Sequence, residues 1–506
     1  MNSRSLRRTR SVIAGLACVL LLSVGMVAAA HADAGSPVVA AVPGAPLVFG
    51  HTEFDLGTVG YVQSEVFFEG TAAAYGAETT PLSSDGMWTV EPSDQAAYKS
   101  RAVVNRPIDP DDFNGTVLVE WLNVSGGVDA GPDWQHTHVE LIRRGYAWIG
   151  VSAQAVGVNQ LKCPTPPDPS CPSGVGGPTP GDPDRYGTLN HPGDSFSYDI
   201  FSQAGQAIRD HADVVLGGLQ PEVLIAAGES QSAGRLVTYI NAIQPQHHVY
   251  DGFFVHSRGS GGAPLRQAPQ TPTITPPSPT FMRQDLDVPV VVFQAETDAG
   301  GVAARQPDSD GPLEYRLYEV AGTAHFDLYG LAQAGLDMGR RSTVAEWFDS
   351  MRHPVSEPLP NFVCSTPINS GPATFVARAA IAHLDDWIRH GTPPPMAPRL
   401  ETTSLSPVVY ARDSNGIARG GVRTPAVDVP VAVLSGFGQS GSPFCSLFGT
   451  TVPFSADELT ERYRNHGGFV SRWNRATHDA LAAGFIVGED AADLRSVAAM
   501  SDVLKK

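Results

Sequence analysis

Three residue types that together catalyse acyl transfer occur shortly after apolar runs of the kind that form buried strands. Ser230, Asp298 and His325 each lie within a few residues of the end of such a run. A serine hydroxyl becomes a nucleophile when an imidazole takes its proton and an acid orients the imidazole. In sheets of parallel strands, functional groups gather at the carboxyl ends of the strands. The types, order and placement of these three residues therefore predict a hydrolytic triad.

The serine lies in a segment typical of a nucleophile elbow. Gly228-Glu229-Ser230-Gln231-Ser232 directly follows the apolar run 223–227, and helix-like sequence continues over 235–240. In a nucleophile elbow, a strand is followed by a tight turn of small residues and then by a helix. The turn strains the serine backbone and exposes the hydroxyl. Ser232 is an alternative nucleophile, because small residues also lie two places on either side of it. Ser230 is favoured since it comes immediately after the strand, and Ser232 then replaces the usual glycine.

Two carboxylates follow the expected strand 288–294 and compete for the role of the triad acid. Asp298 is preferred because it lies in the loop beyond the strand, where a short side chain suits a fixed approach to an imidazole. Glu296 is the alternative acid. Whichever carboxylate does not serve the triad is expected to cap or solvate the loop.

His325 is the preferred histidine because it lies on the loop after the expected strand 315–320 and follows both acids in the chain. His256 ends a strand but precedes both acids, which is the wrong order. The remaining candidates lie in expected helices, where a packing or surface role is the simpler interpretation: His136, His138, His211 and His383.

Acyl transfer also needs two backbone N–H groups that hold the oxyanion. One is expected from Gln231, the residue after the nucleophile. The other is expected from the loop after the apolar strand 116–121, where glycines follow closely and let the backbone approach a substrate. The candidates in this window are Asn123, Val124 and Ser125.

The elements that must position these residues alternate between strands and helices. Such alternation predicts a mostly parallel central sheet with helices on both faces, which is an α/β fold. The expected strands are 61–68, 116–121, 146–151, 223–227, 252–256, 288–294 and 315–320, and the expected helices are 135–144, 198–216, 235–240 and 373–390. No internal repeat is present in the sequence.

The first 32 residues are predicted to be a secretory signal peptide. Four arginines precede an apolar stretch of small residues, and Ala30-His31-Ala32 matches a cleavage site. No other segment is long and apolar enough to span a bilayer, so no membrane association is expected after cleavage. The formal net charge of −18 becomes more negative when the signal is removed, which argues against nucleic acid as a partner.

The cysteines favour disulfides in an oxidising compartment. One cysteine leaves with the signal, and the four that remain allow three connectivities. The favoured pairs are Cys163–Cys171, which would close a Pro-rich loop, and Cys364–Cys445. Their spacing does not suit zinc, so no metal is expected. Phosphate- and dinucleotide-binding motifs are also missing from the sequence, and no cofactor is expected.

The mature chain is expected to form one domain over 47–506, preceded by a flexible lead-in at 33–46. Regions rich in proline, glycine or irregular sequence interrupt it and are expected to be lid-like or surface insertions. These insertions cover about 162–193, 259–287 and 340–370, and a C-terminal extension over about 400–506 is expected to pack on the core.

The chain resembles a family of bacterial exported alpha/beta-hydrolase domain proteins. The matching segments occur in order along nearly all of the mature chain. They are Trp121-Leu122-Asn123-Val124-Ser125-Gly126-Gly127, Gly228-Glu229-Ser230-Gln231-Ser232, Glu296-Thr297-Asp298, Ala321-Gly322-Thr323-Ala324-His325 and Gly420-Gly421-Val422-Arg423-Thr424-Pro425. The resemblance implies an α/β-hydrolase fold that includes the C-terminal tail, with Ser230 as nucleophile and Asp298 and His325 as its partners.

Together these patterns predict an exported serine hydrolase that cleaves carboxylic esters through an acyl-enzyme. An acyltransferase or amidase with the same triad is the main alternative, and a non-catalytic binding protein on a hydrolase scaffold is a further one. The sequence leaves open whether the ester is a small molecule or a polymer, and it leaves the oligomeric state open.

Overall fold

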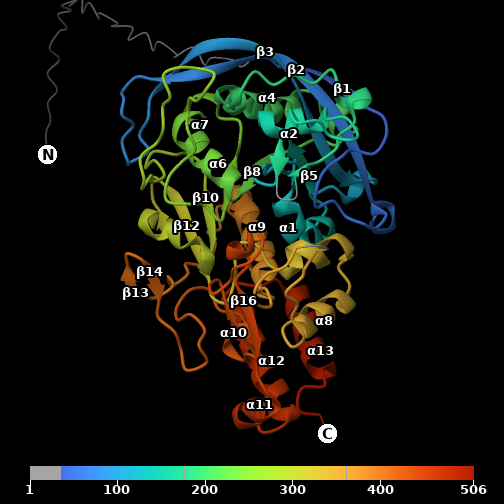
Figure 1. Ribbon diagram of the computed structural model, residues 1–506, viewed down its shortest axis with the longest axis vertical. Coiled ribbons are helices and arrows are strands. Elements are labelled where there is room, and N and C mark those ends of the chain that lie inside the picture. Colours follow the sequence, from blue (N-terminus) through green and yellow to red (C-terminus); the bar gives the residue numbers. More distant parts are fainter. Residues whose placement is uncertain (1–35, 175–176, 360–361, 506) are drawn as a thin grey trace, which may run out of the picture. The chain divides into compact units, whose positions relative to one another are not determined.

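The computed structural model describes residues 36–174, 177–359 and 362–505. The predicted signal peptide lies outside these residues. Within them, a mixed sheet of ten strands runs in the order β1-β2-β3-β5-β4-β8-β9-β10-β12-β11 (Figure 1). Its strands are β1 (Val38–Val42), β2 (Tyr61–Ala77), β3 (Val90–Pro107), β4 (Thr116–Trp121), β5 (Ala147–Val151), β8 (Val223–Glu229), β9 (Gly252–His256), β10 (Val290–Ala295), β11 (Ser309–Asp310) and β12 (Glu314–Val320).

The middle of the sheet is parallel. Strands β5, β4, β8, β9, β10 and β12 pair in parallel with their neighbours, and the residues of β4, β5, β8, β9 and β10 are buried throughout. Strands covered on both faces are expected to be continuous apolar runs, and these are the runs visible in the sequence. Their carboxyl ends lie at one edge, which is where the predicted triad residues follow.

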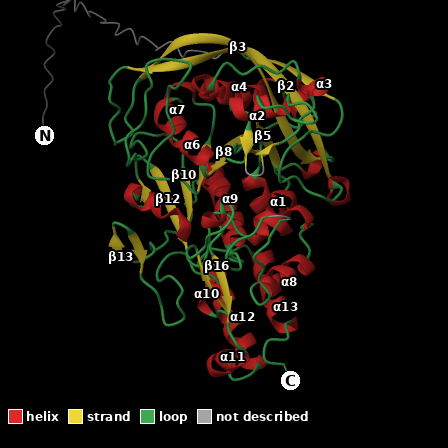
Figure 2. Cartoon of the chain, in the orientation of Figure 1, coloured by secondary structure: helices red, strands yellow, loops and turns green. Residues whose placement is uncertain are grey.

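Helices cover both faces of the parallel strands (Figure 2). On one face α1 (Pro132–Arg143) contacts β5 and β8 and packs on α9 (Ala373–His390), which also contacts β8, β9 and β10. On the other face lie α4 (Ser197–Asp210) and α6 (Gln231–Ala242), which contact β2 and β8 respectively. The sheet is thus enclosed as the sequence predicts, and the fold is that of an alpha/beta hydrolase.

Short helices connect these larger elements and contribute to the inserted regions. They are α2 (Ala155–Leu161), α3 (Pro183–Tyr186), α5 (Ala212–Val215), α7 (Gln244–His247) and α8 (Arg341–Ser350). The small hairpin β6 (Ser173–Gly174) and β7 (Gly177–Pro178) lies in the insertion at 162–193. Both favoured disulfides are present, Cys163–Cys171 and Cys364–Cys445.

The antiparallel side of the sheet differs from the sequence-based expectation. Residues 38–42, expected to be a flexible lead-in, form β1 and pair with β2. The long strand β3 was not expected, because its first half is largely exposed and has no apolar alternation. It forms because β2 pairs with it along nearly its whole length, and β5 pairs with its second half. Strand pairing, and not an apolar sequence pattern, therefore specifies β3.

The C-terminal extension packs as a second hydrophobic core against the region at 340–370. The sequence predicts a lid-like insertion there, but its helix α8 packs Phe348 against Phe469 and Trp473 of the extension, and Trp347 is buried in the same cluster. Figure 1 shows the helices of the extension grouped away from the β2–β3 ribbon. Its elements are β13 (Thr402–Leu405), β14 (Val408–Tyr410), α10 (Pro425–Asp428), β15 (Ala432–Ser435), β16 (Thr450–Pro453), α11 (Ala456–Tyr463), α12 (His466–Ala482) and α13 (Gly488–Met500).

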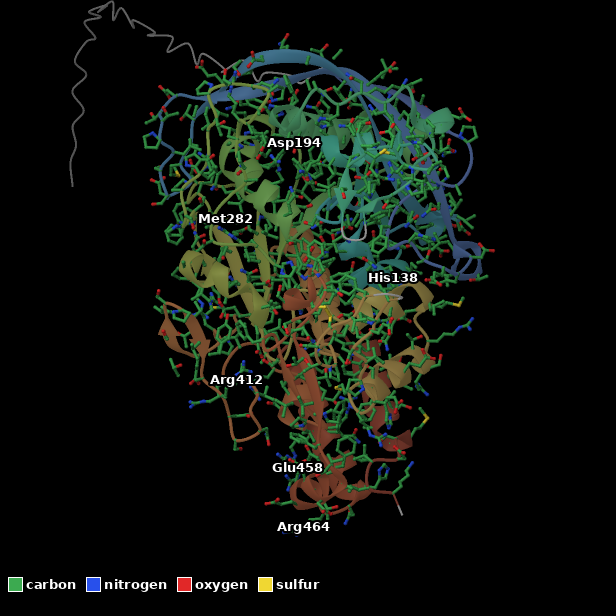
Figure 3. All side chains as sticks on the ribbon, viewed as in Figure 1. His138, Asp194, Met282, Arg412, Glu458 and Arg464 are labelled. Carbon is green, nitrogen blue, oxygen red and sulfur yellow. A yellow bond between two sulfur atoms is a disulfide. The ribbon has the colours of Figure 1, made fainter. Side chains whose placement is uncertain are left out.

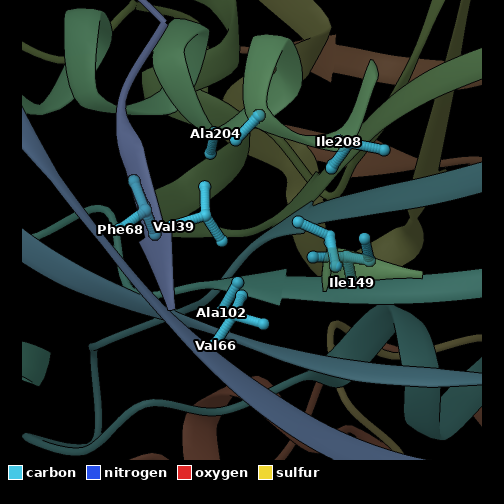
Figure 4. Close-up of a pocket in the computed structure, with 9 residues that line it drawn as sticks. Val39, Val66, Phe68, Ala102, Ile149, Ala204 and Ile208 are labelled. Carbon is cyan, nitrogen blue, oxygen red and sulfur yellow. The ribbon is translucent and has the colours of Figure 1, made fainter. Parts of the chain in front are cut away.

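A small apolar cavity lies between the antiparallel strands and α4 (Figure 4). Its volume is about 10 Å3, which is at the lower limit for a single water molecule. Val39, Phe68 and Ile208 are among the residues that line it. It is a packing void in the core, remote from the strand ends that carry the predicted triad. Among the helices of the described chain, none is long and apolar enough to cross a membrane.

Candidate active site

Ser230 lies at the sharp turn between β8 and α6. Its backbone has φ 59° and ψ −113°, a conformation that residues other than glycine rarely adopt. Two hydrogen bonds hold the turn: Ser230 N donates to His256 O at 2.9 Å, and Gly234 N donates to Ser230 O at 3.2 Å. A side chain at Gly228 would approach the Ser232 Cβ to 3.1 Å, so the turn requires small residues on both sides. This is the strained geometry predicted from the sequence.

A chain of hydrogen bonds joins Ser230 to His325 and Asp298. Ser230 Oγ lies 2.7 Å from His325 Nε2, and His325 Nδ1 lies 2.5 Å from Asp298 Oδ1. With its proton on Nδ1, the imidazole donates to the carboxylate and accepts from the serine hydroxyl. The second oxygen of Asp298 accepts from Ala295 N at 2.7 Å, which fixes the orientation of the carboxylate. The structure therefore brings the three preferred residues together.

The two alternative residues have other surroundings. Ser232 is completely buried at the start of α6, and its Oγ has no hydrogen-bond partner in the described chain. Glu296 is also completely buried, and it accepts from Gly322 N at 2.7 Å and from Gly436 N at 3.2 Å. It forms an ion pair with Arg412 of the C-terminal extension at 3.1 Å. Arg412 is labelled in Figure 3.

Glu296 therefore connects the strand end that bears Asp298 to the chain just before His325 and to the extension. Burial raises the pKa of Glu296, and Arg412 and the two backbone N–H groups oppose that rise. This is more than the capping or solvating role expected from the sequence. It was not visible there because Arg412 and Gly436 lie more than a hundred residues further along the chain.

In the loop after β4, the N–H groups of two of the three predicted oxyanion donors already donate hydrogen bonds within the protein. Asn123 N donates to Ala130 O at 2.9 Å, and Ser125 N donates to the Asn123 side chain at 2.8 Å. Within the described residues, Val124 is left as the one member of this window whose N–H has no such bond. Gln231 begins α6, and the first N–H groups of a helix have no partner within it.

Glu229 is a site residue that the sequence analysis did not single out. Its carboxylate is buried at the end of β8, and Oε1 lies 3.1 Å from His325 Nε2, the same nitrogen that faces Ser230. Asn123 Nδ2 donates to the Glu229 carbonyl at 3.0 Å and lies 3.3 Å from Oε2. The available signal was a carboxylate beside the nucleophile, at the end of an otherwise apolar strand.

The electrostatics of this cluster favour a charged imidazole. Burial opposes the charge on His325, but the carboxylates of Asp298 and Glu229 outweigh it and raise the pKa of His325 to about 9. Burial raises the pKa of Glu229 to about 7, although the neighbouring His325 and His256 counteract it.

Behind Glu229 lies a second carboxylate–imidazole pair. His256 is opposite Glu229 in the β8–β9 register, and its Nδ1 is 2.8 Å from Asp133 Oδ1 at the start of α1. Burial lowers the pKa of His256 to about 4. Glu120 accepts from the backbone N–H groups of Asp133 and Trp134, and burial together with the proximity of Asp133 raises its pKa.

The other histidines considered from the sequence lie outside the hydrogen-bonded chain of Ser230. His136 and His138 are buried in α1, and His138 Nε2 lies 2.7 Å from Asp337 O (His138 is labelled in Figure 3). His211 contacts Ser36, and His383 contacts Gly484 O at 2.8 Å. Their packing roles agree with the simpler interpretation.

Half-buried apolar side chains lie beside the His325 loop. Phe326 follows the histidine, and its N–H donates to Leu447 O at 3.4 Å. The cluster to which it belongs contains both cysteines of the Cys364–Cys445 disulfide. Its half-buried members are Phe326, Leu331, Phe362, Phe444 and Leu447. The extension therefore packs beside the loop that carries His325.

No group of three or more His, Cys, Asp or Glu side chains in the described chain is arranged to hold a metal ion. The polar groups at the strand ends place a serine hydroxyl, an imidazole and a carboxylate in contact with one another. This arrangement is the one that acyl transfer to serine requires.

The fold and these strand-end residues define the protein class as an α/β-hydrolase. The chain belongs to the alpha/beta hydrolase domain family, whose model matches residues 29–496. No curated protein matches the sequence.

Solved structures show distant similarity to esterases and related hydrolases. A fungal esterase from Rhizomucor miehei is 13% identical, with 49% of this chain and 75% of that chain covered and a TM-score of 0.25. A putative dienelactone hydrolase from Klebsiella pneumoniae subsp. pneumoniae is 15% identical, covering 50% and 85%, with a TM-score of 0.27. A thermostable esterase from Pseudomonas putida is 12% identical, covering 53% and 75%, with a TM-score of 0.26.

Proposed function

We propose that the protein is an exported serine hydrolase that cleaves carboxylic esters through an acyl-enzyme. The observation that supports this most directly is the continuous contact from Ser230 Oγ to His325 and on to Asp298. The strained backbone of Ser230 adds support, because such strain at a serine between a strand and a helix is typical of a nucleophile elbow.

In the proposed reaction, His325 Nε2 takes the Ser230 proton as the serine oxygen attacks the ester carbonyl. The N–H groups of Gln231 and Val124 hold the oxyanion of the tetrahedral adduct. Val124 is chosen from the predicted window because Asn123 N and Ser125 N already donate hydrogen bonds.

The imidazolium then gives its proton to the leaving alkoxide, and the acyl group remains on Ser230. Water, deprotonated by His325, attacks the acyl-enzyme and releases the acid. Asp298 keeps the proton of His325 on Nδ1 and stabilises the imidazolium throughout.

Export of the protein is supported by two observations. The first 32 residues match a secretory signal, and both disulfides join cysteines that remain after its removal. Sequencing the amino terminus of the secreted protein tests this proposal. A mature chain that begins near Asp33 is expected, and an intact Met1 would contradict it.

The nucleophile is tested with nitrophenyl esters of increasing acyl length and with a fluorophosphonate probe. Ser230→Ala is expected to lower kcat by about 10^4-fold or more and to abolish labelling. Ser232→Ala is the matched control and is expected to keep kcat within about tenfold. Activity that survives Ser230→Ala and falls in Ser232→Ala would overturn the assignment. Adding a competing alcohol separates hydrolysis from acyl transfer in the same assay.

A further inference from the structure

Glu229 provides a carboxylate at the reactive nitrogen of the triad, in addition to Asp298 at the opposite nitrogen. Its Oε1 is 3.1 Å from His325 Nε2, whereas Ser230 Oγ is 2.7 Å from the same atom. In the described chain, Oε1 accepts no aligned hydrogen bond, although it is buried. A buried carboxylate oxygen without a donor is costly, so a donor that forms during the reaction would stabilise it.

That donor is the Nε2–H of the imidazolium. When the imidazole is neutral, the lone pair of Nε2 accepts from the Ser230 hydroxyl, so Nε2 offers no proton to Glu229. When His325 takes the serine proton, Nε2–H lies between Ser230 Oγ and Glu229 Oε1. A charge-assisted hydrogen bond to a carboxylate is stronger than one between neutral groups.

We propose that Glu229 is a second carboxylate of the catalytic centre, which accepts a hydrogen bond from His325 Nε2–H and stabilises the imidazolium formed during acyl transfer. No proton moves to Glu229: the proton passes from Ser230 to His325 and then to the leaving alkoxide. This role rests on the proposed serine-hydrolase function. A consequence is that the free enzyme holds its base protonated near neutral pH and reaches full activity at alkaline pH.

Four further groups surround the contact between His325 and Glu229, and each comes from a different segment of the chain. His325 faces Asp298 and Glu229, and Glu229 also faces the Asn123 amide, His256 and Asp133. His256 has a pKa lowered to about 4 by burial, so it carries no charge in the neutral range. The pKa of Asp133 is raised by burial, which favours its neutral form. The ionisable groups left to set the charge at His325 are Asp298 and Glu229.

The amide of Asn123 gives the arrangement a structural basis. It holds both the backbone and the carboxylate of Glu229, while its oxygen accepts from Ser125 N. Asn123 therefore connects the proposed oxyanion loop, the residue before the nucleophile and the carboxylate at Nε2. This position keeps Glu229 beside the imidazole and away from the solvent.

The test is the pH profile of kcat/KM for wild type and Glu229→Gln, which keeps the shape and removes the charge. The acidic limb is expected to move to lower pH by about one to three units, because an opposite charge this close raises the pKa of an imidazole by that amount. The alkaline plateau of kcat is expected to fall by about 10- to 100-fold. The activity of Glu229→Gln relative to wild type is therefore expected to be higher near pH 7 than at the alkaline plateau.

Asp327→Asn is the matched control. Asp327 is a buried carboxyl two residues from His325, and burial raises its pKa to about 7, but its Oδ1 accepts from Gly330 N and it does not contact the imidazole. The acidic limb of the kcat/KM profile of Asp327→Asn is expected to lie at the same pH as in wild type. Equal shifts in both variants, or no shift in Glu229→Gln, would overturn the proposal.

Imidazole 15N NMR separates this proposal from the proposed function, because it needs no turnover. The His325 signal is identified by its loss in His325→Gln, and its midpoint is expected near pH 9 in wild type and lower in Glu229→Gln. A lowered midpoint in a protein that cleaves no ester supports the contact and refutes the esterase function. A wild-type midpoint near 6.5 overturns the proposal even if Glu229→Gln does not fold.

Discussion

Two carboxylate–imidazole pairs of similar geometry lie at the same edge of the sheet. In one, His325 Nδ1 is 2.5 Å from Asp298, and in the other, His256 Nδ1 is 2.8 Å from Asp133. Their proton affinities nevertheless differ by several pH units, since the pKa of His325 is about 9 and that of His256 is about 4.

The surroundings of the carboxylates explain this difference. Asp133 is buried close to Glu120, and two buried carboxylates near each other resist ionisation together. Asp298 is oriented by Ala295 N, and Glu296, the buried carboxylate two residues before it, is bound instead by Gly322 N, Gly436 N and Arg412. His325 also has Glu229 at its second nitrogen, and its side chain is 12% exposed, whereas that of His256 is 2% exposed.

An imidazole paired with an aspartate is therefore not by itself a catalytic base. A serine hydroxyl within reach, a second carboxylate at Nε2 and access to solvent distinguish the first pair from the second. The second pair is a neutral, sealed contact that joins β9 to the start of α1.

The largest expected difference between the pairs is in proton affinity. In imidazole 15N spectra at pH 7, His325 is expected to be protonated and His256 neutral, because carboxylates raise the pKa of the former and burial lowers that of the latter. A titration from pH 4 to 10 measures both midpoints, with His256→Gln identifying the second signal. Midpoints within one pH unit of each other would remove the distinction.

The next largest effect is expected from removing the charge of each aspartate. Asp298→Asn is expected to lower kcat by about 10^4-fold, since the amide stabilises the wrong tautomer and no longer stabilises the imidazolium. Asp133→Asn, the matched change in the other pair, is expected to keep kcat within about tenfold. Ester hydrolysis at the alkaline plateau measures both. Similar losses in the two variants would show that the pairs act as one unit.

The disulfides provide a smaller contrast, between the segment beside His325 and a remote loop. Cys364–Cys445 closes a sequence separation of 81 residues, and Cys163–Cys171 closes one of 8. Replacing both cysteines of the first pair by alanine is expected to lower the free energy of unfolding by about 4 kcal/mol, against about 2 kcal/mol for the second pair. Urea unfolding measures both.

Only the first disulfide variant is also expected to lower kcat, because Phe326, next to His325, donates its N–H to Leu447 O, two residues beyond Cys445. An equal loss of activity in the second variant would contradict the assigned role of the extension at His325.

The smallest effect is expected at Glu296, the alternative acid, which does not contact His325. Glu296→Gln is expected to lower the free energy of unfolding by about 2 kcal/mol, because charge-assisted bonds to Gly322 N and Gly436 N weaken and Arg412 loses its partner. Denaturant unfolding and kcat of the folded protein are measured together. A kcat loss as large as that of Asp298→Asn would favour Glu296 as the triad acid.

Much of the fold is readable in the sequence, because the central strands are continuous apolar runs and the helices between them have clear boundaries. The antiparallel side of the sheet is harder to predict from the sequence, because β3 has a largely exposed first half and is specified by its pairing with β2 and β5. Residues 340–370 read as irregular because the aromatic partners of Phe348 lie in the distant extension.

For the candidate site, the sequence by itself determined the order of serine, acid and histidine and their positions after buried strands. Which groups surround the imidazole was decided only by the tertiary structure. Glu229 meets His325 because the ends of β8 and β12 converge on the same edge, and Glu296 turns towards Arg412 and not towards the imidazole. Local sequence specifies strands through apolar burial, but contacts between loops that are far apart in the chain depend on how the strands are arranged in the sheet.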